Sequence, residues 1–153
     1  MTRQHVSNRA FELHNTGFHC AEAVLLASLE QKGIHIPGGI PRFATCFGGG
    51  VGKTHTELCG ALSGGLIALG CLSGRDEPGA DWDKAASLAA EFRKRFLEEF
   101  GSSTCKDILA SLGDQENMIK CKRLSGATAG LLFDLLEQGV GDKEGSHACC
   151  CKP

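Results

Sequence analysis

Helical periodicity runs through almost all of the 153 residues and constrains the fold more than any other feature. It is clearest over residues 82–100, where one face carries apolar side chains: Trp82, Ala85, Ala89, Phe92, Phe96 and Phe100. On the other side, Glu91 and Arg95 have the spacing of an i,i+4 ion pair. No segment alternates apolar and polar residues as a half-buried strand does. We therefore expect an all-α fold, a single-domain bundle of about five to six helices.

Glycine-rich and polar breaks divide the rest of the pattern into shorter helices. These helices are expected at residues 6–14, 20–29, from 54 or 56 to 72, 105–112, and from after residue 114 to 135. Residues 33–53 hold seven of the 21 glycines and are predicted to form a long loop, which is often a functional feature in a compact domain. We expect residues 1–138 to form the helical domain and residues 139–153 a flexible, cysteine-rich tail.

Charge and hydropathy indicate a protein without a nucleic-acid partner or a membrane span. The formal net charge is −2, so no basic excess marks a nucleic-acid site. The most apolar window, residues 58–73, is shorter than a bilayer span, and the first residues lack the apolar run of a signal peptide. We therefore expect a cytoplasmic protein, whose thiols are kept reduced.

Nine cysteines are many for a cytoplasmic chain, and they favour metal or redox roles over structural disulfides. Four of them lie on the apolar stripes of the predicted helices: Cys20, Cys59, Cys105 and Cys121. The first three fall in the first turn of a predicted helix, where the helix dipole stabilises a thiolate, whereas Cys121 is expected two turns into its helix. Any one of them could simply be a small buried hydrophobe. No Cys-x-x-Cys pair is present, so a shared site must be assembled by several helices.

The other cysteines have different positions in the pattern. Cys46 is separated from Cys59 by a glycine-rich loop and is a candidate extra ligand or resolving thiol. Cys71 lies about 18 Å from Cys59 along a continuous helix, so the two cannot bind one cluster. The run Cys149-Cys150-Cys151 is more typical of an oxidation-prone tail than of a metal site. His19 and His55 could each be a ligand or a proton donor, but we interpret both as loop or cap residues.

Two sets of small residues predict close helix packing. Gly60, Gly64 and Ala68 recur at i+4 spacing, as do Gly126 and Gly130. If these two faces meet, Cys59 and Cys121 would lie near one site; ordinary tight packing is the alternative.

One glycine-rich motif resembles the end of a phosphate-binding loop. Residues 49–54 read Gly-Gly-Val-Gly-Lys-Thr, but the glycine that the strict pattern requires is replaced by Phe47. No βαβ alternation surrounds the motif, so nucleotide binding is disfavoured.

An ordered set of motifs resembles a known family. The pieces are residues 17–24, 47–52, 59–64 (Cys-Gly-Ala-Leu-Ser-Gly), 96–105 and Cys121. Together, over about residues 10–136, they are similar to the C_GCAxxG_C_C family of redox-active proteins. The resemblance implies that the four family cysteines map onto Cys20, Cys59, Cys105 and Cys121. It also makes the loop at residues 47–52 a family feature, and it supplies no substrate.

The first hypothesis is therefore a redox-active protein whose Cys20, Cys59, Cys105 and Cys121 ligate an iron–sulfur or related metal cluster for electron transfer, with Cys46 as a further candidate. The second is a metal-free thiol–disulfide protein, in which a low-pKa Cys59 attacks and another cysteine resolves. A structural zinc site and a helical interaction module are further alternatives. A redox partner protein is expected and a homodimer is an option, while the pattern does not distinguish an enzyme from a carrier.

Overall fold

The computed structural model describes residues 1–138, and in this part of the chain every regular element is a helix. The helices are α1 (Arg3–Asn15), α2 (Cys20–Glu30), α3 (Arg42–Thr45), α4 (Gly60–Ser73), α5 (Asp83–Phe100), α6 (Cys105–Leu112) and α7 (Ile119–Glu137). The all-α prediction is confirmed. The described helices number seven rather than five or six, because the short α3 forms inside the predicted loop. The predicted tail, with Cys149-Cys150-Cys151, lies outside the described residues.

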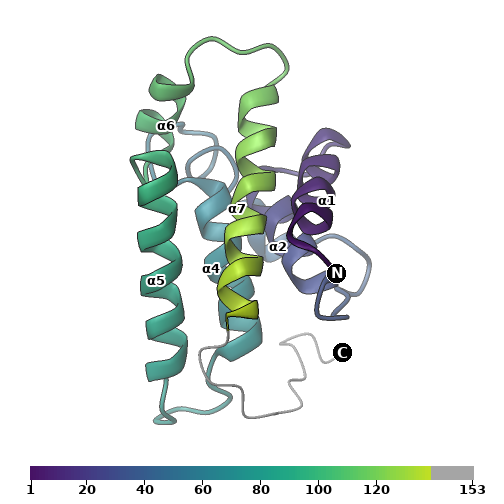
Figure 1. Cartoon of the computed structure of the whole chain (residues 1–153), viewed down its shortest axis with the longest axis vertical. Coiled ribbons are helices and arrows are strands. Elements are labelled where there is room, and N and C mark those ends of the chain that lie inside the picture. Colours follow the sequence, from purple (N-terminus) through teal and green to yellow (C-terminus); the bar gives the residue numbers. More distant parts are fainter. Residues whose placement is uncertain (139–153) are drawn as a thin grey trace.

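The helices form a bundle in which α7 is the hub. It packs against α1, α2, α4, α5 and α6. Figure 1 shows α5 and α1 on opposite sides of α7, with α2 and α4 behind it. Within residues 1–138, no helix is long and apolar enough to cross a membrane.

The core lies between α2, α4, α5 and α7. Helix α2 is buried from Ala21 to Leu29, which explains why it is apolar on every side. Helix α5 is amphipathic: Phe92 and Phe96 are fully buried, and each contributes about 1.5–3 kcal/mol through burial. On its outer side the predicted Glu91–Arg95 pair is confirmed, with Arg95 Nε 2.8 Å from Glu91 Oε1.

Glycines allow α4 to approach α2 closely and α7 to approach α1 closely. They do not bring the glycine faces of α4 and α7 against each other. A Cβ on Gly64 of α4 would overlap the backbone of Ala21 in α2. A Cβ on Gly126 of α7 would lie 2.7 Å from the carbonyl oxygen of Ser7 in α1. The Gly60 and Gly126 faces therefore do not meet, because each face receives a different helix, and the alternative of ordinary tight packing applies to both.

Helices α4 and α7 begin later than expected, and each follows a segment with left-handed backbone. Residues 49–53 and His55 have φ between 57° and 68°, so this segment cannot belong to a right-handed helix. This excludes a helix start at residue 54, and the antiparallel bridge between Leu58 and Thr104 keeps the following residues out of a helix, so that α4 begins at Gly60 instead of residue 54 or 56. Likewise, Asn117 and Met118 have φ of 48° and 56°, which delays the start of α7 to Ile119.

Candidate functional site

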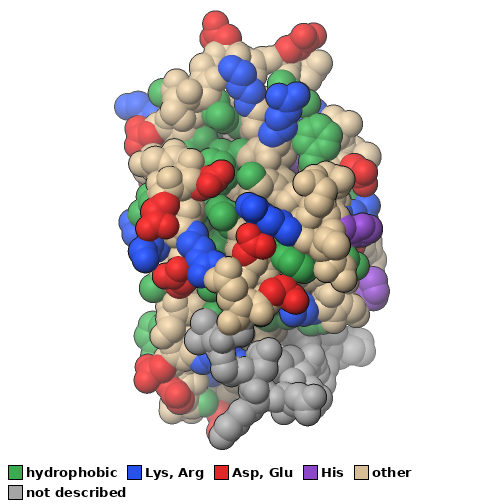
Figure 2. Space-filling view, in the orientation of Figure 1, with side chains coloured by type: hydrophobic (Ala, Val, Ile, Leu, Met, Phe, Trp, Pro, Cys, Tyr) green, Lys and Arg blue, Asp and Glu red, His purple; other side chains and the backbone are tan. Residues whose placement is uncertain are grey.

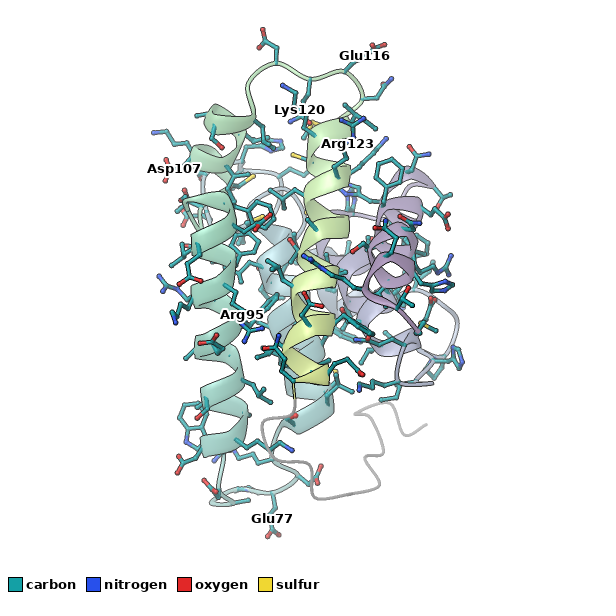
Figure 3. All side chains as sticks on the ribbon, viewed as in Figure 1. Glu77, Arg95, Asp107, Glu116, Lys120 and Arg123 are labelled. Carbon is teal, nitrogen blue, oxygen red and sulfur yellow. The ribbon has the colours of Figure 1, made fainter. Side chains whose placement is uncertain are left out.

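The four cysteines singled out by the sequence line one cavity of about 360 Å³. They come from four different helices: Cys20 from α2, Cys59 from the N-cap of α4, Cys105 from α6 and Cys121 from α7. Figure 3 shows several sulfur atoms between α6 and α7, towards the end of the bundle where the connection between these helices lies. The tertiary structure thus brings together residues as far apart in the sequence as Cys20 and Cys121.

Each of the four cysteines lies at the N-terminal end of its helix. Cys20 and Cys105 are the first residues of α2 and α6, and Cys59 is the N-cap of α4. Cys121 is the third residue of α7, which corrects the expectation that it lies two turns into its helix. Four helix N-termini, with their partial positive charges, therefore face one cavity.

A pair of backbone hydrogen bonds fixes Cys59 next to Cys105. The segments that precede α4 and α6 form an isolated antiparallel bridge between Leu58 and Thr104. The Cys59 N–H donates to the Ser103 carbonyl at 2.8 Å, and the Cys105 N–H donates to the Glu57 carbonyl at 2.7 Å. Thr104 also caps α6, since its Oγ1 accepts from the Asp107 N–H at 3.4 Å. The two cysteines are thereby held by backbone geometry, independently of their side chains.

Two glycines leave room for the sulfur atoms. A Cβ on Gly60 would overlap Cys20 Sγ and lie 2.8 Å from the Phe47 carbonyl oxygen. A Cβ on Gly50 would lie 2.5 Å from Cys105 Cβ and 3.2 Å from its Sγ, and Gly50 also has a φ of +68°. The Cys-Gly pair at residues 59 and 60 is therefore a packing requirement: the glycine makes space for the sulfur of α2.

Gln115 positions Cys121, and sequence reasoning missed it. Its Oε1 accepts from the N–H groups of Lys120 and Cys121, both at 3.0 Å. Its Nε2 lies 3.4 Å from Cys121 Sγ, to which it donates. A side-chain acceptor a few residues before a helix could have indicated a capping role, but Gln115 is farther from α7 than an ordinary cap.

Basic and imidazole groups complete the wall of the cavity: His14, His19, Lys53 and His55 line it, whereas none of its lining residues is Asp or Glu. His14 was not predicted as a site residue. Its Nδ1 lies 2.9 Å from Ser125 Oγ, and burial, with smaller contributions from Lys122 and His19, lowers its pKa from 6.5 to about 4. His14 is thus held neutral at the side of the cavity.

Burial raises the pKa of three of the cavity thiols in the metal-free protein. Burial is the main cause that raises the pKa of Cys59 from 9.0 to about 12, and the neighbouring Cys20 and Cys105 raise it further. The N–H groups of Leu62 and Ala61 lower this pKa, but burial outweighs them. Burial likewise raises the pKa of Cys105 and of Cys121. The expectation of a low-pKa Cys59 is therefore wrong for the metal-free state, because desolvation exceeds the effect of the helix terminus.

The remaining described cysteines lie outside this cavity. Cys46 is exposed and Cys71 is partly buried near the far end of α4, and neither is among the cavity-lining residues. The predicted role of Cys46 as a further ligand or resolving thiol stays a prediction. Across residues 1–138, no group of three His, Cys, Asp or Glu side chains is arranged to hold a metal ion.

Comparisons with known proteins give one match. Residues 18–135 match the model of a protein family described as "Putative redox-active protein (C_GCAxxG_C_C)". No curated protein and no solved structure matches the chain significantly. The family match spans well over half of the chain and includes all four cavity cysteines. The chain therefore belongs to the C_GCAxxG_C_C family of redox-active proteins.

Proposed function

We propose that this protein binds an iron–sulfur or related metal cluster through Cys20, Cys59, Cys105 and Cys121 and uses it for electron transfer. The observation that carries the proposal is that four cysteine-bearing helix N-termini line one cavity. Most ways of packing these helices would not bring four cysteines to one cavity. If the thiols were buried by chance, they would not all lie at the N-terminal ends of their helices.

The donor set and the cavity both fit such a group. Thiolates are the usual ligands of iron–sulfur clusters, and four of them complete the common ligand set. A cavity of about 360 Å³ has room for a polynuclear cluster, whereas a single ion needs far less space. A cluster with four thiolates carries negative charge, which four helix N-termini and Lys53 at the cavity wall would stabilise. When bound, the cluster would supply the change of oxidation state.

The protein's own residues would hold the group and shield it. Apolar side chains of Ile108, Leu109 and Leu124 line the cavity and would limit the access of water. The Gln115 Nε2 donor would place a hydrogen bond on Cys121 Sγ, a contact that tunes cluster potentials in general. Because burial raises the pKa of three thiols, binding of a metal would have to displace their protons.

The metal-free thiol–disulfide hypothesis is less well supported. It requires a reactive thiolate, since the thiolate is the attacking species. The pKa of Cys59, near 12, leaves almost none at neutral pH. The structural zinc hypothesis uses the same four ligands, although within residues 1–138 no three such side chains are arranged to hold a single ion. Metal analysis separates it from the cluster.

The decisive experiment is metal analysis of protein purified without oxygen. Iron, zinc and acid-labile sulfide are measured together with a visible spectrum for the wild type, Cys59→Ser and Cys71→Ser. We expect iron and sulfide in the wild type, their loss in Cys59→Ser and their retention in Cys71→Ser, because Cys71 is not a cavity-lining residue. Circular dichroism confirms that both variants are folded.

Other results would contradict the proposal. Stoichiometric zinc without colour would support a structural zinc site. A metal-free wild type with a rapidly reacting cavity thiol would support thiol–disulfide chemistry instead. Equal loss of iron in Cys59→Ser and Cys71→Ser would show that neither variant reports on the cavity alone. A comparison of Cys105→Ser with Cys46→Ser would then distinguish loss of a cavity ligand from a general loss of stability.

A further inference from the structure

Exposed apolar side chains are concentrated in one segment beside the cysteine cavity. Among the described residues, seven large hydrophobic side chains are exposed, and four of them lie within residues 40–51: Ile40 (56%), Phe43 (47%), Phe47 (36%) and Val51 (41%). Phe43 lies in the short helix α3, Ile40 directly precedes the N-cap of this helix, and Phe47 lies in the turn that follows it. We call these four residues, together with Arg42 and Lys53, the loop patch.

The loop patch is basic in a protein that is acidic overall. Residues 31–56 contain Lys32, Arg42 and Lys53 but no Asp or Glu, which gives this segment a formal charge of +3. The chain as a whole has a formal charge of −2, so the rest carries −5. Lys32 is paired with Glu137, whereas Arg42 and Lys53 are exposed and form no ion pair with any residue of 1–138.

Backbone contacts connect the loop patch directly to the sulfur atoms. The Phe47 side chain is exposed, but its carbonyl oxygen lies against Gly60, next to Cys59 in the chain. Gly49 and Lys53 of the same loop line the cysteine cavity, and Gly50 packs against Cys105. A protein bound to the loop patch would therefore be separated from the cavity by little more than one layer of backbone.

We infer that the loop patch is the docking surface for an acidic electron-carrier protein. The inference rests on the proposed function and adds the location and the chemistry of its partner. Exposed aromatic residues supply the apolar contact, and Arg42 and Lys53 attract the negative surface of the carrier. In each transfer the carrier loses one electron and the cysteine site gains it, or the reverse, and no bond is made or broken.

Two other occupants fit the loop patch less well. A second copy of the chain would need a complementary acidic surface, but Figure 2 shows acidic and basic side chains interspersed on the face that it displays. On α5, Glu91 is paired with Arg95 and Glu98 with Lys94. An anionic membrane is typically bound by about four to eight clustered Lys or Arg residues, and the loop patch offers two.

The test measures binding of a defined carrier to the whole protein as purified. The probe is a purified acidic ferredoxin of the plant type, and the dissociation constant is measured by calorimetry at about 20 and about 300 mM NaCl. The variants are Phe43→Ala and Arg42→Glu, which change exposed side chains of α3 outside the cavity. Their matched controls are Trp82→Ala, another exposed aromatic residue, and Arg93→Glu, an equal charge change on α5. Helix α5 packs against α4 and α7, whereas α3 packs against α2 and α4.

We expect Phe43→Ala to weaken binding about tenfold and Arg42→Glu about three- to tenfold, with changes below about twofold in both controls. Higher salt should weaken binding to the wild type and reduce the difference that Arg42→Glu makes. Iron content, measured on the same samples, should be unchanged in all four variants.

Three outcomes would overturn the inference. Absence of binding, or equal effects of the variants and their controls, would remove the loop patch as the docking surface. A dimer in light scattering that Phe43→Ala dissociates would assign the surface to a second copy. Binding to phosphatidylglycerol vesicles that Arg42→Glu abolishes would assign it to a membrane. If the protein contains no iron but binds the carrier through the loop patch, only the proposed function is contradicted. If the protein contains iron but does not bind the carrier through the loop patch, only this inference is contradicted.

Discussion

Both ends of α4 carry a Cys and a Gly, but the surroundings of these residues differ between the two ends. At its start, Cys59 and Gly60 lie among residues of four other helices, and Gly64 contacts the α2 backbone. Near its other end, a Cβ on Gly70 would meet nothing within 4 Å, and Cys71 lies outside the cavity. A Gly or Cys in a helix therefore acquires its role from what faces it.

The polarity of the helix adds to this difference. The first turn of α4 presents free N–H groups, which favour negative charge, while the last turn presents free carbonyl groups, which oppose it. A thiolate or an anionic cluster is therefore stabilised at Cys59 by the same helix that would disfavour it at Cys71. Because α2, α6 and α7 also direct their N-termini to the cavity, the effect acts four times at one end of the bundle.

The largest expected contrast between the two ends is in thiol reactivity. In metal-free protein, the pKa of Cys59 near 12 gives a thiolate population about a thousandfold below that of a thiol at 9.0. We expect iodoacetamide at about pH 8 to alkylate Cys59 at least this much more slowly than it does in the unfolded chain. The more exposed Cys71 should react earlier. Peptide mapping by mass spectrometry measures both rates, and faster alkylation of Cys59 would contradict the burial argument.

The next contrast is in stability and uses the glycines of α4. Gly64→Ala places a methyl group against the Ala21 backbone and should lower the free energy of unfolding by about 3 kcal/mol. Gly70→Ala fills open space on an exposed helix position and should raise that free energy by about 0.5–1 kcal/mol. Urea denaturation of both variants measures the difference. Similar effects of the two substitutions would show that α2 and α4 are not in the described close contact.

The smallest expected effect is acid sensitivity at the cavity end. Because the folded protein lowers the pKa of His14 from 6.5 to about 4, the unfolded chain binds a proton first as the pH falls. The stability of the metal-free protein should be constant above about pH 6.5 and should decrease towards pH 4 by about 1–2 kcal/mol, after allowance for the partial exposure of the ring.

The variant His14→Gln isolates this contribution, and His5→Gln is its control, because His5 is exposed on α1. We expect His14→Gln to flatten the decrease between about pH 6.5 and pH 4 and His5→Gln to leave it unchanged. Urea denaturation across this pH range gives the comparison. An unchanged slope in His14→Gln would mean that Lys122 and the buried surroundings do not keep the ring neutral.

Local patterns were sufficient for much of the fold. The amphipathic stripe of α5, its end at Gly101 with a φ of 78° and the Thr104 cap of α6 all follow from interactions within a few residues. The four cysteines could be singled out because they recur on apolar stripes. The left-handed backbone at Val51, Lys53 and His55 could not be foreseen, because these residue types disfavour it and only the surrounding contacts maintain it.

The sequence by itself determined the helical class, the helix ends marked by Gly and Thr, and which cysteines were candidates for one site. Only the tertiary structure decided that Cys121 lies in the first turn of its helix, that Gln115 holds it and that Gly60 accommodates the sulfur of Cys20. It also reversed the expected pKa of Cys59. The physical reason is range: helix propensity and capping act between near neighbours, whereas burial and steric fit depend on residues that only the folded chain brings together.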